Sequence, residues 1–161
     1  MKEGIFSLIA LIVAFFMSSC QPQEDFSLVG PEDQVASIEI ITVYNWSGIP
    51  YGGPKYDPED PNSYEIQWTI DPDQHDEFLK ELYKVPCYRY TNDPWESFAK
   101  NTIRVTFTDG SYELIGEVTV YYETPEGDWK YPRYYFNKEG FDKFISTTVE
   151  QVGQGGGSAI P

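Results

Sequence analysis

The stretch TIRVTFTDGSYELI, residues 102–115, decides how this chain folds. Apolar side chains occupy every second position of its first half, at Ile103, Val105 and Phe107. That period predicts a strand with one buried face. Asp109-Gly110 follows and is a strong short-range hairpin signal, for a type I′ turn in which both central residues have positive φ. The segment therefore predicts two antiparallel strands, of which the second returns over residues 112–122.

Residues 64–74, YEIQWTIDPDQ, predict a strand that runs directly into a helix. Apolar or aromatic residues alternate with polar ones, which places four side chains on one predicted face: Tyr64, Ile66, Trp68 and Ile70. Asp71 suits the N-cap, Pro72 the first helical position, and Gln74 completes a capping box. The helix that follows is predicted to bury Phe78, Leu79 and Leu82, with His75 at the edge of this stripe and Pro86 after its end.

Three further segments complete the predicted fold. Residues 35–46 are rich in Ile, Val and Thr and predict a strand, and residues 129–136 predict a third strand of the meander. Asn137 is expected to cap a last helix, whose apolar stripe is Phe141, Phe144, Ile145, Thr148 and Val149. The fold class is therefore α+β: an antiparallel, tyrosine-rich sheet of five or six strands with two helices packed on one face.

The order of elements hints at an internal repeat. Residues 64–70 and 131–136 are aromatic strands that lead into Asp71 and Asn137, and in both cases two apolar residues follow seven positions later. Each unit also comes after a strand that begins with an isoleucine. Two interpretations stay open: a duplicated strand–strand–helix unit, or the capping rules that all helices share.

The N-terminus has the layout of a secretory signal. Lys2 precedes an almost wholly apolar run at residues 5–17, and the small residues Ser18 and Ser19 then lead to Cys20. A membrane-spanning anchor needs about 20 apolar residues, and this run is shorter. The other alternative is an ordinary signal peptide that ends near a cysteine by chance.

Residues 17–20 resemble the lipobox of bacterial lipoproteins, in which signal peptidase II cleaves before a cysteine that becomes lipidated. The resemblance implies that Cys20 is the lipid attachment site and that the first partner of the protein is a lipid bilayer. It also implies a place in the bacterial cell envelope, on the non-cytoplasmic side of a membrane. The strand–cap–helix order of the rest is loosely similar to small uncharacterised envelope lipoproteins, a resemblance that implies no activity.

Four parts are expected along the chain. Residues 1–19 form the signal peptide, residues 20–34 the lipidated cysteine with a flexible tether, residues 35–150 a single α+β domain, and residues 151–161 a disordered glycine-rich tail. The fourteen residues 21–34 would reach roughly 45 Å if fully extended. We therefore expect the domain to stand just off the membrane.

Composition restricts the choice of partner and of chemistry. The net charge of −15 argues against nucleic acid and against an anionic lipid surface. Cys87 is the only cysteine besides Cys20, which excludes a disulfide framework within the chain, and its apolar neighbours predict a buried side chain. His75 is the only histidine, and the sequence has no Gly-x-Ser-x-Gly nucleophile elbow.

Two acidic clusters have simpler explanations than a metal site. Residues 71–77 and 57–62 are acidic but depart from the calcium-loop pattern, and helix capping and solvated turns account for both. We expect no cofactor, no metal and no catalytic residues. The competing hypothesis is a small hydrolase that acts on envelope polymers, with paired carboxylates as the catalytic groups.

Aromatic side chains are the best candidates for ligand binding. Trp46, Tyr51 and Tyr56 lie in a loop rich in Gly and Pro, and loop Tyr and Trp residues dominate binding hot spots. A second candidate surface is the outward face of the last hairpin, with Tyr121, Tyr131 and Arg133. The alternatives are that the loop rings cap an open core edge and that a helix covers the hairpin face. The predicted function is a membrane-anchored, non-catalytic binding module for a protein or glycan.

Overall fold

A computed structural model describes residues 23–44, 56–89, 101–117, 120–130 and 134–154. The strands are β1 (Gln23–Glu24), β2 (Val35–Val43), β3 (Tyr64–Ile70), β4 (Cys87–Arg89), β5 (Thr102–Phe107), β6 (Tyr112–Ile115), β7 (Val120–Glu123), β8 (Trp129–Lys130) and β9 (Tyr134–Phe136). The helices are the short 3-10 helices η1 (Glu32–Gln34) and η2 (Pro72–Gln74) and the α-helices α2 (His75–Leu82) and α3 (Lys138–Gln154).

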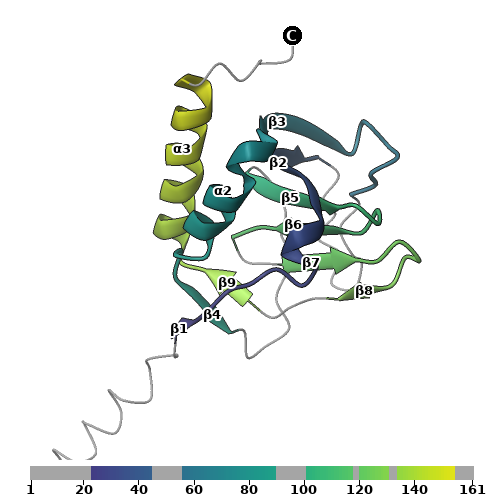
Figure 1. Cartoon of the computed structure of the whole chain (residues 1–161), viewed down its shortest axis with the longest axis horizontal. Coiled ribbons are helices and arrows are strands. Elements are labelled where there is room, and N and C mark those ends of the chain that lie inside the picture. Colours follow the sequence, from purple (N-terminus) through teal and green to yellow (C-terminus); the bar gives the residue numbers. More distant parts are fainter. Residues whose placement is uncertain (1–22, 45–55, 90–100, 118–119, 131–133, 155–161) are drawn as a thin grey trace, which may run out of the picture.

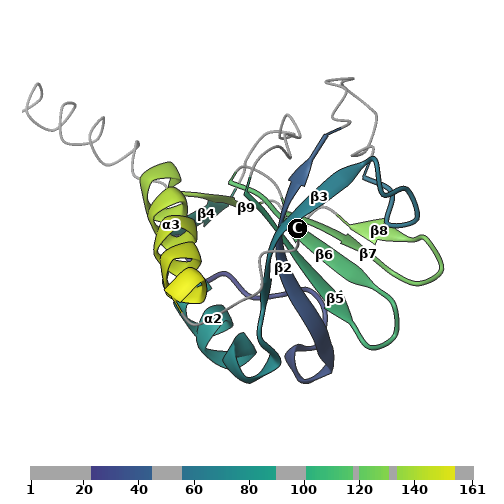
Figure 2. The same ribbon diagram turned by 90° about the horizontal axis from the view of Figure 1, so that it is seen from above.

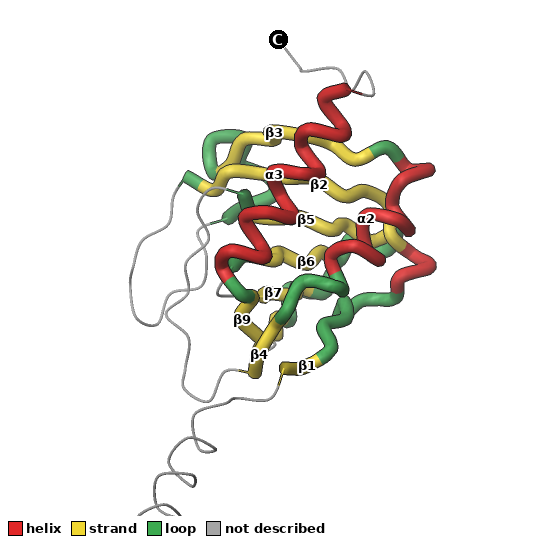
Figure 3. The backbone as a smooth tube through the Cα atoms, turned by 90° about the vertical axis from the view of Figure 1, so that its left-hand side faces the viewer, coloured by secondary structure: helices red, strands yellow, loops and turns green. Residues whose placement is uncertain are grey.

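The described residues form two antiparallel sheets. The larger sheet has six strands in the order β3-β2-β5-β6-β7-β8, and the smaller one has the order β1-β4-β9. Helices α2 and α3 lie side by side across one face of the larger sheet (Figures 1 and 3). Seen from above, the strands fan out on one side of the helix pair (Figure 2). The predicted α+β class, the strand number and the placement of both helices are confirmed.

Apolar side chains are buried on both faces of the larger sheet. The face under the helices forms the main core, which includes Ile38, Ile40, Ile103, Val105 and Phe107 from the sheet and Phe78, Leu79, Leu82, Phe141 and Ile145 from the helices. The opposite face forms a second core of Ile41, Val43, Tyr56, Tyr112, Leu114 and Tyr121. The helix stripes predicted from the sequence are therefore correct, and the sheet has no wholly solvated face.

The Asp109-Gly110 hairpin forms, but with a different turn. Only Gly110 has positive φ, at 91°, and its amide donates to the Phe107 carbonyl at 3.0 Å. Asp109 instead accepts hydrogen bonds from the amide of Ser111 at 2.8 Å and from its hydroxyl at 2.6 Å. These bonds hold Asp109 at negative φ, which gives the three-residue loop of a type I turn followed by a left-handed glycine. The type I′ prediction is wrong.

A bulge in β3 overturns the prediction that its four apolar side chains share one face. Ile40 pairs with Trp68 but Ile41 pairs with Ile66, so one extra residue is inserted in β3. Beyond the insertion the alternation is reversed. Trp68 packs on the main core under the helices, whereas Tyr64 packs on the second core.

The two helix starts differ from each other. Asp71 makes no side-chain capping bond, and the chain passes through the 3-10 turn η2 before α2 begins, so the predicted capping box does not form. Pro72 does occupy the first position of that turn. Asn137 caps α3 as predicted, since its Oδ1 accepts from the amide of Gly140 at 2.8 Å. Helix α3 continues to Gln154, so the predicted disordered tail is wrong for residues 151–154.

Two predicted strands are each divided in the structure. The return strand at residues 112–122 is two paired strands, β6 and β7. The segment at residues 129–136 contributes β8 to the larger sheet and β9 to the smaller one, where β9 pairs with β4. Because β3 pairs with β2 whereas β9 and β5 belong to different sheets, the structure does not support a duplicated strand–strand–helix unit.

Residues 23–30, the N-terminal strap, are part of the folded domain. Phe26 is 3% exposed, and its ring packs edge-on against Tyr83, Tyr134 and Phe136 at centroid distances of 4.9 to 6.0 Å. Gly30 lies directly on the ring of Phe107, where an added Cβ would come within 2.3 Å of a ring carbon. The prediction of a flexible tether is therefore wrong for residues 23–34, because β1, the strap and η1 are ordered there.

A buried carboxyl group holds the strap on the sheet. Glu113 of β6 is fully buried, and its Oε2 accepts from the amide of Val29 at 2.9 Å. Its Oε1 has no hydrogen-bond partner within the described part of the chain. Burial raises the pKa of Glu113 to about 8, against the lowering effect of the bonds from the Val29 and Gly30 amides. The group therefore prefers to be a neutral acid.

The first prediction concerns the pH dependence of stability. The pKa of Glu113 is raised to about 8 in the folded chain, above the ordinary 4.5, so the folded state retains a proton that the unfolded chain has lost. The contribution of Glu113 to the free energy of unfolding should therefore be largest below pH 4.5. It should fall by about 1.4 kcal/mol per pH unit between pH 4.5 and pH 8. Glu113→Gln should remove that slope and stabilise the protein at pH 8.

Urea unfolding of both proteins between pH 5 and pH 8.5 measures the effect, with the exposed Glu59→Gln as the matched control. The advantage of Glu113→Gln over the wild type should grow with pH, and Glu59→Gln should show no such growth. Parallel curves for wild type and Glu113→Gln would contradict the burial of an acid at this position.

Candidate functional site

A buried arginine organises the sheet face opposite the helices. The side chains of Arg104 on β5 and Glu39 on β2 are only 10% and 12% exposed. The Arg104 Nε and Nη2 both donate to Glu39 Oε2, at 2.6 and 2.5 Å, and Nη1 donates to the Tyr56 hydroxyl. The guanidinium carbon also lies 4.5 Å from the centre of the Tyr64 ring. The register explains the meeting, since Glu39 and Arg104 are direct partners across the strands.

The protonation of this cluster follows from its contacts. Burial alone would lower the pKa of Arg104, but hydrogen bonds with Tyr64 and Tyr56 and the charge of Glu39 outweigh it and raise that pKa. Burial raises the pKa of Tyr56 to about 12, although the Arg104 hydrogen bond acts in the opposite direction. At neutral pH Arg104 is therefore a cation and Tyr56 a neutral phenol.

Four tyrosines form a continuous row across this face, the tyrosine row: Tyr64, Tyr56, Tyr112 and Tyr121. Neighbouring ring centres are 5.1, 5.3 and 6.0 Å apart. At the far end, the carboxylate of Glu123 accepts from the Tyr112 hydroxyl at 2.7 Å and from the Tyr121 hydroxyl. Burial, and then the bond to Glu123, raise the pKa of Tyr112 above its ordinary value. A carboxylate thus lies at the Tyr112–Tyr121 end of the row.

The structure describes only two of the sequence-predicted ligand residues. Tyr56 is 7% exposed and Tyr121 is 6% exposed, and both belong to the second core. Tyr121 lies on the sheet face that the alternation predicted, but the expectation that it is exposed is wrong, because Tyr112 and Leu114 pack around it. Tyr56 likewise caps the second core. The remaining candidates lie outside the described residues: Cys20, Trp46, Tyr51, Tyr131 and Arg133.

The acidic turns and the histidine have structural roles. Asp57 Oδ1 accepts from the amide of Glu59, and Asp60 Oδ1 accepts from the amide of Asn62, both at 2.9 Å. These bonds close two turns before β3, as expected for solvated turns. His75 is buried, with its Nε2 3.3 Å from the Ile70 carbonyl. No group of three or more His, Cys, Asp or Glu side chains that could hold a metal occurs among the residues that the structure describes.

An accessible groove of about 480 Å³, the helix groove, lies between η1 and α2. Its lining residues are Glu32, Asp76, Leu79, Lys80, Tyr83 and Lys84. Five of them come from one stripe of α2 and the turn after it, at i, i+3, i+4, i+7 and i+8 spacing, and η1 supplies the sixth. Leu79 is buried and forms the apolar floor together with the half-buried ring of Tyr83. Its size is that of a typical ligand pocket.

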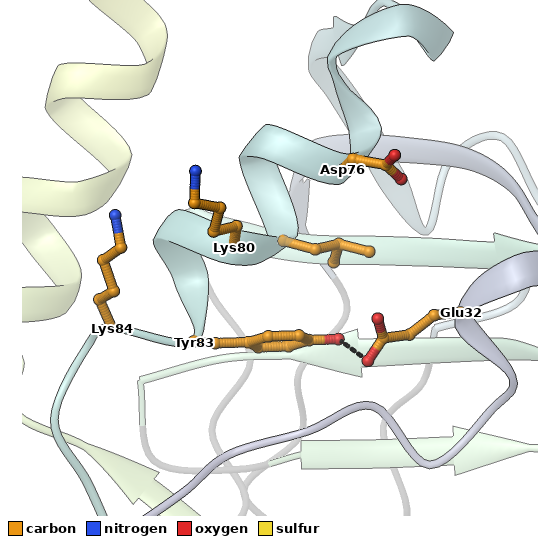
Figure 4. Close-up of a pocket in the computed structure, with 6 residues that line it drawn as sticks. Glu32, Asp76, Lys80, Tyr83 and Lys84 are labelled. Atoms are coloured by element: carbon orange, nitrogen blue, oxygen red, sulfur yellow. Dashed lines mark hydrogen bonds between the residues drawn. The ribbon is translucent and has the colours of Figure 1, made fainter.

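Charges of opposite sign lie at the two ends of the helix groove. The ammonium groups of Lys80 and Lys84 lie on one side of the Tyr83 ring, and the carboxylates of Asp76 and Glu32 lie on the other (Figure 4). The Tyr83 hydroxyl donates to Glu32 at 2.7 Å, and burial followed by this bond raises the pKa of Tyr83. The groove therefore offers an apolar floor, two cations and two carboxylates to a ligand.

Both lysines are exposed, and only surface ion pairs hold them. Lys80 pairs with Glu77 at 3.1 Å, and Lys84 pairs with Glu81, but the lysine side chains are 64% and 58% exposed. Such exposed pairs at i, i+3 contribute little to stability, so a ligand carboxylate competes with them at low cost. The helix groove was missed in the sequence because Glu32 was assigned to a flexible tether. The stripe of α2 itself was visible in the spacing of its residues.

The second prediction concerns the buried ion pair. Arg104→Met should leave the Glu39 carboxylate unpaired at a nearly buried site, which typically costs about 3 to 5 kcal/mol of unfolding free energy. The double variant Arg104→Met with Glu39→Met should recover a large part of that loss, because both charges are then gone. Urea unfolding of the two single variants and the double variant forms the test cycle. Additive losses would contradict a direct Arg104–Glu39 interaction.

Comparison of the chain with protein-family models, with curated proteins and with solved structures gave no match. Among the described residues, no helix combines the length and the apolar character that a membrane span requires.

Proposed function

We propose that this chain is a membrane-anchored lipoprotein of the bacterial envelope whose domain is a non-catalytic binding module. The partner is a protein or a glycan, and the helix groove is its binding site. The observation that carries the proposal is the groove itself: an open hollow of about 480 Å³ with an apolar floor and charges of both signs. The tyrosine row does not carry it, since those rings are largely buried.

Anchoring is supported by the sequence. The apolar run at residues 5–17 ends in Ser18-Ser19-Cys20, which resembles a lipobox. A diacylglycerol on Cys20 would hold the domain stably at a bilayer, since two acyl chains bind far more strongly than one. The charge of −15 keeps such a domain soluble and away from anionic surfaces.

Between the two classes of partner, the chemistry of the helix groove favours a protein segment. A polypeptide brings apolar, cationic and anionic side chains together, and these match the Leu79 floor, the carboxylates and the lysines. A glycan would rely on an open aromatic platform, and Tyr83 is half-buried with its hydroxyl already bonded to Glu32. The edge of the Tyr83 ring and the four charged groups of the groove therefore suit a partner polypeptide that lies along α2.

The alternative of a small hydrolase gains no support from the raised pKa of Glu113. A catalytic acid has to reach its substrate, and Glu113 is fully buried beneath the N-terminal strap. It does not line the helix groove. Glu113 accepts hydrogen bonds from backbone amides of the strap, which gives this carboxyl group a structural role.

The third prediction tests the anchor. Wild-type protein should partition into detergent and carry acyl chains on Cys20, and Cys20→Ala should remain unlipidated and partition into water. Phase separation and mass spectrometry of the mature N-terminus measure both properties. A mature N-terminus at another residue, without lipid, would contradict the proposal.

The fourth prediction tests the helix groove. Lys80→Gln with Lys84→Gln should weaken partner binding about tenfold, equivalent to ~1.4 kcal/mol, because both cations of the groove are lost. A photo-reactive residue at position 80 should cross-link one discrete partner in intact cells, and a reactive residue at position 143 on α3 should not. The cross-linked partner, once identified, supplies the ligand for affinity measurements.

The matched control is Lys143→Gln, which removes an exposed lysine of α3 outside the groove. Thermal unfolding should be nearly unchanged in both proteins, because exposed ion pairs contribute about 0 to 1 kcal/mol. Equal binding by the double variant and the control would rule out the groove as the site and leave the anchor unaffected.

A further inference from the structure

The smaller sheet has an inner and an outer face. Cys87 and Phe136 are register partners and are buried in the main core. Because side chains alternate along a strand, their neighbours point away from the core. Gln23, Tyr88 and Tyr135 are partners of one another in the next row, and they form the outer face of this sheet.

An aromatic pair dominates this outer face. The rings of Tyr88 and Tyr135 are stacked, with centres 5.3 Å apart and planes at 28°. Both side chains are half-buried, whereas Gln23 and the following Asp25 are exposed. Tyrosine combines an apolar ring with a polar hydroxyl, and for that reason it is enriched where protein meets lipid headgroups.

The distance from the anchor to this sheet is short. Three residues, 20–22, span from Cys20 to the start of β1 at Gln23. At no more than about 3.3 to 3.6 Å each, they reach about 10 Å. The headgroup layer on one side of a bilayer is about 5 to 8 Å thick. A lipid on Cys20 therefore holds β1 at the level of the headgroups or directly above them.

We propose that the outer face of the smaller sheet, with Gln23, Tyr88 and Tyr135, lies against a bilayer of zwitterionic phospholipids. The proposal rests on the lipidation of Cys20 proposed above. The exposed Asp25 follows β1 beside this face; its charge repels anionic lipid but attracts the ammonium groups of zwitterionic headgroups. The stacked tyrosines pack among those headgroups with their hydroxyls hydrated.

The N-terminal strap makes this orientation rigid. A flexible tether would let the domain tumble above the membrane, but Phe26 is fixed between Tyr83, Tyr134 and Phe136. The Cys87 thiol also donates to the Glu24 carbonyl at 3.0 Å and ties β1 to β4. The acyl chains are thus joined to the N-terminal strap, which is itself packed on the core. The loop before β3 lies on the opposite side of the domain from β1 (Figure 1).

Spin labels at single cysteines test this orientation. Gln23→Cys and Asp25→Cys place labels at exposed positions beside the outer face, and Glu59→Cys places one in the turn before β3. Native Cys87 is fully buried, and burial raises its thiol pKa to about 11, so it stays unlabelled. The lipidated protein is reconstituted in phosphatidylcholine vesicles that contain a nickel-chelating lipid.

Nickel at the headgroups should relax the labels at positions 23 and 25 at least severalfold more strongly than the label at position 59. Insertion of ten Gly and Ser residues between Pro22 and Gln23 should abolish that difference while Cys20 keeps its lipid. A soluble nickel complex should give the opposite order, with the strongest relaxation at position 59, because that label faces the solvent. Two labelled sites guard against the loss of one variant through misfolding.

The outcomes separate the two proposals. Equal relaxation at positions 23, 25 and 59 in protein that is lipidated on Cys20 would overturn the orientation and leave the anchor intact. A difference that survives the ten-residue insertion would overturn the role of the short connection and would support the contact of the face itself with the headgroups. Mass spectrometry without lipid on Cys20 would instead defeat the anchor.

Discussion

Strand β2 has to bury both of its faces, and the rest of the architecture follows from that constraint. Ile38 and Ile40 point into the main core, and Ile41 and Val43 point into the second core. Helices cover the first face, and a layer of tyrosines covers the other. Because β2 and β5 are central strands, the Arg104 side chain is only 10% exposed, and its charge needs Glu39 beside it. The ion pair is thus a consequence of burying both faces of the larger sheet.

Local patterns were sufficient for the main elements of the fold. The alternation at residues 102–115, the stripes of both helices and the cap at Asn137 depend on neighbours within a few residues, and the structure retains them. The failures have non-local causes. The β3 bulge depends on pairing with β2, and the ordered strap depends on the packing of Phe26 against Tyr83, just after α2, and against two rings of β9. Acidic composition around residues 24–33 concealed the two apolar positions that fix it.

The candidate site was harder to predict than the fold. Glycine and proline near Tyr56 indicated a loop, but exposure depends on what packs against a ring, and Arg104 and Tyr112 do so here. The alternation of side chains along β7 placed Tyr121 on the correct face of the sheet, but it did not indicate that the ring is buried. The helix groove combines a helical stripe with Glu32, which lies more than 40 residues earlier in the chain. Spacing rules describe one element at a time, so a site between two elements is invisible to them.

The strap also constrains the order in which the chain acquires its structure. Phe26 contacts Tyr134 and Phe136, more than 100 residues further along. Its binding place between those rings is complete only after β9 has joined β4. The first residues of the described part of the chain therefore depend on its C-terminal part for their packing, and such contacts between distant parts of a chain slow folding. Until then, a chain already attached to a membrane would display Phe26 and Leu28 to the lipid, and the final step of folding would withdraw them.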